Sequence, residues 1–145
     1  MNYIIREASL ADTEAIWMLN CTEMGYPFPL EATRDKLEKL LRRGSDKIYV
    51  ATIDETVVGY VHANDYDVIY APHMKNIMGI AVTHEHKHKG IGKALLQQVE
   101  LWAKDTGAAG IRLVSGASRT GAHEFYRRCG FTGDKKQLNL KKKLR

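Results

Sequence analysis

The sequence has few of the features that define several classes of protein. Its 145 residues include two cysteines, Cys21 and Cys129, which lie far apart and lack CxxC spacing. Such a pair makes neither a disulfide framework nor a zinc knuckle, so we expect reduced thiols, with no role assigned to either, in a cytoplasmic protein. No apolar run approaches the roughly 20 residues that cross a bilayer, and residues 1–7 lack the layout of a signal peptide. We therefore expect no membrane partner.

Positive charge is not spread evenly over the chain. The formal net charge is +5, but residues 135–145 alone contribute six lysine or arginine residues and no acid. The rest of the chain is close to neutral, with 16 basic and 17 acidic side chains. A nucleic-acid interface is expected to show a basic face with interleaved aromatic residues. A basic tail on a nearly neutral body therefore does not predict a nucleic-acid partner.

The hydrophobic pattern predicts one α/β domain, residues 1–145, without internal repeats or low-complexity linkers. Helical spacing, with capping and breaking residues at the ends, predicts four helices, which begin at Ser9, Leu30, Gly92 and Ala122. In the second, which runs to Arg43, three leucines are expected to face inward: Leu37, Leu40 and Leu41. Strands are predicted at residues 3–6, 48–53, 57–61, 76–82, 111–114 and 137–144.

The most informative segment lies between the predicted strand 76–82 and the helix that follows it. A loop with Gly90 and Gly92 leads into that helix, so several backbone N–H groups point into one concavity at the positive end of the helix dipole. Glycine lets such a backbone approach a phosphate without a Cβ in between, and nearby lysines add positive charge. The segment predicts a cradle for a pyrophosphate, and a turn that merely needs glycine is the alternative.

Other phosphate loops and metal sites do not fit this segment. A Walker A loop needs four residues between its glycines and then Gly-Lys-Ser/Thr, and the Rossmann fingerprint needs a third glycine. His84, His86 and His88 alternate along the chain, but no carboxylate or cysteine completes a set of ligands. We therefore expect no metal.

Two further motifs accompany the loop. Residues 87–92 read Lys-His-Lys-Gly-Ile-Gly, residues 122–131 read Ala-His-Glu-Phe-Tyr-Arg-Arg-Cys-Gly-Phe, and residues 57–59 read Val-Val-Gly. Residues 87–92 resemble the Gln/Arg-x-x-Gly-x-Gly/Ala motif of the GNAT superfamily of N-acetyltransferases. Residues 122–131 resemble its Ala-x-x-Phe-Tyr-x-x-x-Gly-Phe signature, and residues 57–59 resemble its third strand. Lys87 departs from the first motif, because lysine keeps the charge of arginine but loses its fork of donors. The resemblance covers nearly the whole chain.

The resemblance implies the GNAT fold, a central mixed, mostly antiparallel sheet of six or seven strands flanked by about four helices. A bulge in the fourth strand would splay it from the fifth and leave a cleft for acetyl-CoA, the acetyl donor. The pantetheine arm would pair with the edge of the fourth strand, and the pyrophosphate would lie on the loop amides. The residues implied as cofactor-binding are Ile80, Ala81, Val82, Lys87, His88, Lys89, Gly90, Ile91, Gly92, Lys93 and Arg119.

The implied activity is transfer of acetyl to a primary amine of a small molecule, by direct attack in a ternary complex. Tyr126 is implied as the catalytic acid that protonates the departing thiolate, because a phenol stays neutral at physiological pH. Related enzymes often carry a glutamate base on the fourth strand, where this chain has Gly79. The side chains that remain as candidates for the base are His62, Asp65, His73 and Glu23.

Substrate contacts are expected from the segments around residues 23–28 and 64–73, and the residues singled out are Glu23, Tyr26, Asp65 and His73. Acidic side chains in these segments favour a cationic amine. The resemblance leaves a homodimer open. Two other functions also stay open: a non-catalytic acetyl-CoA-binding regulator, which the missing glutamate favours, and a nucleotide-binding switch that uses the glycine loop.

Overall fold

The computed structural model describes residues 2–145. Its elements fall into two compact units, one that ends at Leu113 and one that spans Val114–Arg145. The first unit contains β1 (Ile4–Glu7), η1 (Leu10–Asp12), α1 (Thr13–Thr22), α2 (Leu30–Leu41), β2 (Asp46–Ile53), β3 (Thr56–Tyr66), β4 (Met74–Val82), η2 (His84–His86), α3 (Ile91–Asp105) and β5 (Gly110–Leu113). The second contains α4 (Thr120–Arg128). Within residues 2–145, no helix combines the length and apolar character that a membrane span needs.

Five strands form the sheet in the order β1-β2-β3-β4-β5, with β4 and β5 parallel and the other neighbours antiparallel. The mixed, mostly antiparallel sheet is confirmed, but the expected count of six or seven strands is wrong. The predicted closing strand, residues 137–144, has no regular structure, and its leucines are at least 83% exposed. Alternating leucines satisfy the pattern of a strand. A strand also needs a neighbouring edge for its N–H and C=O groups, which the pattern cannot supply.

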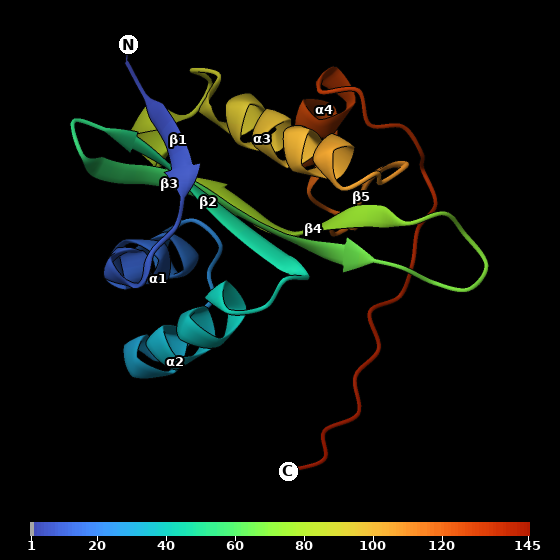
Figure 1. Ribbon diagram of the computed structural model, residues 1–145, viewed down its shortest axis with the longest axis horizontal. Coiled ribbons are helices and arrows are strands. Elements are labelled where there is room, and N and C mark those ends of the chain that lie inside the picture. Colours follow the sequence, from blue (N-terminus) through green and yellow to red (C-terminus); the bar gives the residue numbers. More distant parts are fainter. Residues whose placement is uncertain (1) are drawn as a thin grey trace. The chain divides into compact units, whose positions relative to one another are not determined.

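Helices cover both faces of this sheet within the first unit (Figure 1). α1 and α2 lie on one face, where Leu19 and Leu37 belong to a buried cluster that includes Tyr60 of β3. α3 lies on the other face, and its Leu95 and Val99 are fully buried. Residues four apart share one face of a helix, so a single apolar stripe on each helix is enough to cover the sheet.

α2 is shorter than predicted, because it ends at Leu41 and not at Arg43. Leu37 is 4% exposed and Leu40 packs against the core, whereas Leu41 is 38% exposed. Consecutive residues lie about 100° apart around a helix, so Leu41 turns away from the stripe that Leu37 and Leu40 share. The prediction that Leu41 faces inward is therefore wrong.

A buried carboxylate joins the first strand to the first helix. The Asp12 carboxylate accepts hydrogen bonds from Nη1 and Nη2 of Arg6, at 2.8 and 2.9 Å, and from the backbone N–H of Ser9, at 2.8 Å. The bonds from Arg6, against a smaller opposing effect of burial, lower the pKa of Asp12 below its ordinary value. Ser9 precedes the helical turn as predicted. The backbone N–H of Ser9 donates to the Asp12 carboxylate.

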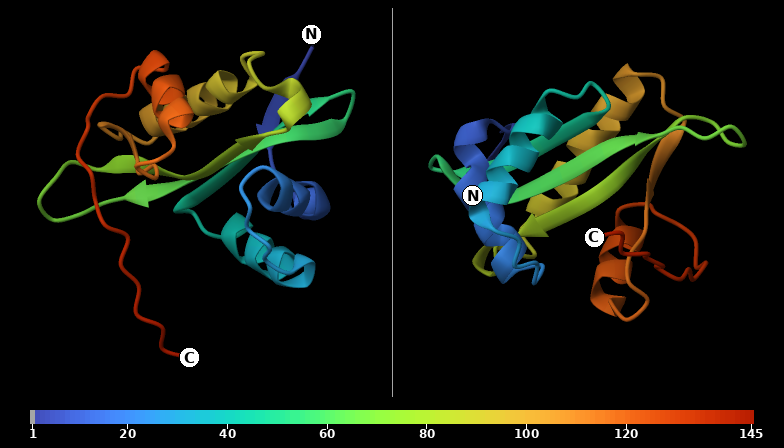
Figure 2. Two further views of the ribbon diagram at one scale, coloured as in Figure 1. Left: turned by 180° about the vertical axis from the view of Figure 1, so that it is seen from behind. Right: turned by 90° about the horizontal axis from the view of Figure 1, so that it is seen from below.

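The predicted hairpin between β2 and β3 is confirmed. Asp54 and Glu55 form its two-residue turn, and both have left-handed backbones, with φ of 49° and 67°. Turns with two left-handed residues match the twist of the strands they connect. The next connection, from β3 to β4, projects beyond the ends of α1 and α2 (Figures 1 and 2).

Candidate functional site

The pairing of β4 with β5 stops at a bulge in β4. His62 of β3 pairs with Gly79 and Ala63 pairs with Ile77, so Met78 is an extra residue on β4. Pairing between β4 and β5 ends at Ile77 and Leu113. From residue 78 to Val82, β4 therefore has an edge with no strand beside it in the described sheet. The expected bulge is present, and β5 ends level with it, at Leu113.

The glycine loop lies directly after this open edge. Its backbone is left-handed at His88 (φ 63°) and at Gly90 (φ 84°), which caps the N-terminus of α3. The first hydrogen bond of α3 runs from the Ala94 N–H to the Gly90 carbonyl, at 3.0 Å. Among the described residues, the N–H groups of residues 88–93 have no recorded acceptor. The loop therefore presents free donors at the positive end of a helix, an arrangement that binds anions.

Glu23 connects the end of α1 to this loop. One of its carboxylate oxygens accepts the His84 N–H at 3.2 Å, and the other pairs with Lys87 Nζ at 3.2 Å. The Glu23 side chain is only 15% exposed. Both contacts fix the loop, so the predicted substrate residue Glu23 has partners within the protein and holds the first lysine of the motif.

The segment after α1 is fastened at its far end. The indole N–H of Trp17 donates to the Phe28 carbonyl at 2.8 Å, and the Tyr26 N–H donates to the Asn20 carbonyl at 2.9 Å. The side chain of Tyr26 is 57% exposed. Tyr26 is thus a surface residue on a segment whose backbone is tied to α1.

A buried phenol that the sequence analysis missed lies beside Gly79. A side chain at Gly79 would begin 3.6 Å from the hydroxyl oxygen of Tyr60 and 3.6 Å from the end of Met24. Tyr60 donates to the Asn20 side-chain oxygen. Burial raises the pKa of Tyr60 to about 12, with a smaller opposing effect of the bond to Asn20, so the phenol stays protonated. Gly79 lies 19 positions after Tyr60 in the chain, so no local sequence pattern indicates that the two are neighbours.

His62 lies opposite Gly79 and is held by an acid. Its Nε2 is 2.7 Å from Asp46 Oδ2, and Asp46 also accepts the Ser45 hydroxyl at 3.0 Å. Nδ1 of the ring forms no hydrogen bond with another residue among residues 2–145. Directly paired residues of antiparallel strands place their side chains on the same face, so His62 shares the face of Gly79.

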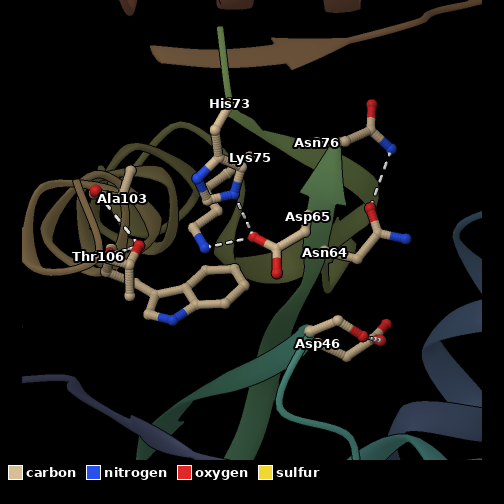
Figure 3. A network of polar contacts seen from close by, with 10 residues as sticks. Asp46, Asn64, Asp65, His73, Lys75, Asn76, Ala103 and Thr106 are labelled. Atoms are coloured by element: carbon tan, nitrogen blue, oxygen red, sulfur yellow. Dashed lines mark hydrogen bonds and ion pairs between the residues drawn. The ribbon is translucent and has the colours of Figure 1, made fainter. Parts of the chain in front are cut away.

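The predicted candidates Asp65 and His73 form a separate cluster with Lys75 (Figure 3). Asp65 Oδ1 lies 2.6 Å from His73 Nε2 and 2.5 Å from Lys75 Nζ. Lys75 is 2% exposed, and its ammonium lies 3.7 Å from the ring centre of Trp102 in α3. Burial alone would raise the pKa of Asp65, but the hydrogen bonds from Lys75 and His73 lower it below its ordinary value. This cluster faces α3, whereas His62 and Gly79 face α1.

The second unit carries two of the predicted site residues, Tyr126 and Arg119. Tyr126 of α4 stacks at an angle on Phe125, at 5.4 Å between ring centres, and edge-on against Phe131 at 5.9 Å. Burial raises the pKa of Tyr126, and the nearby charge of Arg119 opposes that effect. Arg119 is exposed and precedes the first residue of α4. Tyr126 is therefore a neutral phenol at physiological pH.

Residues 2–145 contain no group of three or more His, Cys, Asp or Glu side chains arranged to hold a metal ion. His86, one of the alternating histidines, instead bonds the Thr83 hydroxyl through Nδ1 at 2.8 Å. The other predicted cofactor residues lie on β4, in the loop and in the first turn of α3. Ala81 is buried, Ile80 and Val82 are half-buried, and Lys89 of the loop and Lys93 of α3 are exposed.

A family model described as "Acetyltransferase (GNAT) family" matches residues 13–131. The chain belongs to the GNAT acetyltransferase family. Among curated relatives, this GNAT chain is 32% identical over 84 residues to the streptothricin acetyltransferase of Escherichia coli, a match that covers 58% of the chain and 46% of the relative. The chain spans about half the length of the curated relatives it matches.

Solved structures confirm the GNAT fold. The aminoglycoside antibiotic 6'-N-acetyltransferase AAC(6')-Ih of Acinetobacter baumannii superimposes with a TM-score of 0.86 at 20% identity, over 99% of both chains. A protein of Bacillus halodurans described as a transcriptional regulator gives a TM-score of 0.86 at 21% identity, over 97% of this chain and 99% of that one. Identities this low establish the fold and leave the activity to be argued from the site.

The ion pair between Asp65 and the buried Lys75 leads to a stability prediction. Asp65→Asn should lower the free energy of unfolding by about 3 kcal/mol at neutral pH, because it leaves a buried ammonium without its carboxylate. Since the pKa of Asp65 is lowered in the folded state, its contribution is present above the ordinary value of 3.8 and is lost as the pH falls through the lowered value. Urea denaturation at neutral and at acidic pH measures both effects.

The control for this prediction is Asp67→Asn, which removes an exposed carboxylate from the same connection. It should change the free energy of unfolding by less than about 0.5 kcal/mol. Equal losses in the two variants, or a loss for Asp65→Asn that does not shrink in acid, would contradict the assigned ion pair.

Proposed function

We propose that the protein is an N-acetyltransferase that moves acetyl from acetyl-CoA to a primary amine of a small molecule, by direct attack in a ternary complex. The observation that carries the proposal is the combination of an unpaired β4 edge with free loop N–H groups directly after it. An extended pantetheine arm needs the first feature and a pyrophosphate needs the second. Both lie on one continuous stretch of chain, residues 78–93.

The residues present fit the coenzyme. The N–H and C=O groups of Ile80 and the C=O group of Val82 would bond the pantetheine amides, and the N–H groups of residues 88–93 would hold the pyrophosphate. Lys89 and Lys93 are exposed and free of ion pairs within the described residues, so their charge is available for phosphate. Lys87 is already paired with Glu23, and its role is to order the loop.

The acetyl transfer needs an oxyanion donor, a proton donor for the leaving thiolate and a base for the amine. The nitrogen lone pair of a neutral amine attacks the thioester carbon, and a strand-end N–H near Val82 would stabilise the oxyanion that forms. The carbon–sulfur bond then breaks, and the electron pair leaves with sulfur. Tyr126 would give its proton to that thiolate, and the raised pKa that burial gives the phenol keeps the proton available at physiological pH.

His62 is the best placed of the four candidates for the base. It is opposite Gly79, the position where related enzymes often carry glutamate, and Asp46 fixes its ring. Glu23 and Asp65 are engaged by cations, and His73 belongs to the cluster on the other face. His62 would remove the proton from the attacking amine directly or through one water molecule.

A non-catalytic regulator that binds acetyl-CoA is the second candidate function. Gly79 favours it, because no ionisable side chain occupies the usual position of the base. The Bacillus halodurans protein of the same fold that is described as a transcriptional regulator gives the alternative a precedent. The two functions differ in one measurement, the release of CoA thiol in the presence of amines.

Gly90 and Gly107 provide a matched test of the cradle. Both have left-handed backbones at opposite ends of α3, and a Cβ would meet no atom within 4 Å at either. Alanine at either site should cost about 1 kcal/mol of stability through backbone strain. Gly90→Ala should also weaken CoA binding roughly tenfold, or about 1.4 kcal/mol, because its methyl group enters the proposed pyrophosphate site. Titration calorimetry with CoA and thermal unfolding measure these effects; equal affinity in the two variants refutes the cradle.

Tyr126→Phe tests the catalytic acid. The variant should bind acetyl-CoA as the wild type does, but kcat should fall by roughly 100-fold, because the thiolate must leave without a positioned proton donor. Thiol release across a panel of amines measures the rate, and Tyr3→Phe, which changes a tyrosine just before β1, is the control. If no amine accelerates thiol release from bound acetyl-CoA in the wild type, the regulator is the correct function.

His62→Gln and His73→Gln test the base, because each removes a histidine that is paired with an aspartate. His62→Gln should lower kcat/KM by roughly 100-fold near neutral pH, and His73→Gln should change it less than about twofold. The deficit of His62→Gln should shrink as the pH rises, since a growing fraction of the acceptor amine is then already deprotonated. A deficit that is independent of pH, or equal in the two variants, would show that His62 is not the base.

A further inference from the structure

A polar surface continues the proposed acceptor site along the sheet. Residues 60, 62, 64 and 66 of β3 alternate onto the face that carries α1 and α2, as the burial of Tyr60 against those helices shows. On the neighbouring strand, Asn76 pairs with Asn64, and on β5 Arg112 pairs with Asn76. The side chains of Asn64, Tyr66, Asn76 and Arg112 therefore meet on one face, beyond the part that the helices cover.

These side chains hold the guanidinium of Arg112 in one orientation. Its Nη1 donates to the Asn76 side-chain oxygen at 2.7 Å, and the carbon of the guanidinium lies 4.1 Å from the ring centre of Tyr66. Asn76 in turn donates to Asn64 at 3.3 Å, a contact that Figure 3 shows on the opposite side of the strands from Lys75. Stacking and one hydrogen bond leave most of the five donors of the guanidinium unused.

The charge of Arg112 is not neutralised within the protein. Among residues 2–145, no carboxylate forms an ion pair with Arg112, whereas Asp46 is paired with His62, Asp65 with Lys75 and Glu23 with Lys87. Of the acids in the segments 23–28 and 64–73, Glu23 and Asp65 are thus engaged, and the exposed Asp67 forms no ion pair with Arg112 or with another described residue. An oriented, unpaired guanidinium matches the geometry of a carboxylate.

This guanidinium lies within reach of the reacting centre of the proposed function. Asn76, the partner of Arg112, is three residues from Gly79 on β4, which is less than about 10 Å at roughly 3.3 Å per residue. The extra residue Met78 places Asn76 and Gly79 on the same face, although strict alternation would put them on opposite faces. One small molecule is long enough to reach from Gly79 to Arg112.

We propose that Arg112, with Asn64, Tyr66 and Asn76, forms a subsite for a carboxylate of the acceptor, so that the preferred substrate is an amine that carries a carboxylate several bonds away. The proposal rests on the proposed acetyltransferase function and specifies its substrate class. A diamine of the same length would place a second cation against Arg112 and bind less well. A purely structural Arg112, which only ties β5 to β4, would make no such distinction.

The test compares three acceptors of one length with the full chain and acetyl-CoA: an ω-amino acid with five methylene groups, its neutral amide and the corresponding diamine. The wild type should prefer the amino acid over the amide at least tenfold in kcat/KM, mainly through KM. Arg112→Gln should bring that ratio to within about twofold of unity, and Arg112→Lys should keep part of it, because lysine retains the charge but not the fork. KM for acetyl-CoA should not change in either variant.

Lys104→Gln is the matched control, because it removes one exposed positive charge from α3, on the other face of the sheet. It should leave the preference as in the wild type. A wild type that uses the diamine or the amide as well as the amino acid overturns the subsite while the acetyltransferase function stands. So does a ratio that Arg112→Gln leaves unchanged.

A binding measurement separates the subsite from the proposed function. Glutarate is titrated into the CoA-bound protein, and the guanidinium NMR signal that is lost in Arg112→Lys is followed. A shift of that signal without turnover of any amine supports the subsite and refutes the acetyltransferase. If the signal does not shift up to the highest soluble concentration of glutarate, the subsite is refuted, whether or not an amine is acetylated.

Discussion

Strand β4 is hydrogen-bonded to β3 along its length but to β5 only as far as Ile77, and the site is built on this unequal pairing. The extra residue Met78 marks the change. Before it, Ile77 pairs with Ala63; after it, Gly79 pairs with His62, so the two residues lie on opposite faces although they are two positions apart. The bulge thus gathers Asn76, Gly79 and Ala81 on the face of α1 and frees the edge that follows.

The sequence predicts what local pattern determines. The helix stripes, the β2–β3 hairpin and the glycine loop were recoverable because each depends on residues close together in the chain. The closing strand was not, since alternating leucines at 138–144 do not reveal whether an edge is available to pair with. Leu41 shows the same limit within a helix, because a one-residue difference in phase decides between core and solvent.

The residues of the candidate site likewise divide into those that a local pattern predicts and those that depend on distant partners. The loop residues follow from a motif, whereas Tyr60, His62 and Arg112 gain their roles from partners on other strands or helices. Acids that looked free in the sequence are paired in the structure, Glu23 with Lys87 and Asp65 with Lys75. Such pairs join residues ten or more positions apart, and charge patterning along the chain cannot reveal them.

The two tryptophans of the chain sit on opposite sides of this arrangement. Trp17 holds the segment after α1 through the Phe28 carbonyl, and Trp102 lies under the ammonium of Lys75 in the cluster that faces α3. An indole emits light according to its polar surroundings, so each ring is an optical probe of a different region. Replacing either with phenylalanine leaves a single tryptophan, whose emission reports on one region alone, without any attached dye.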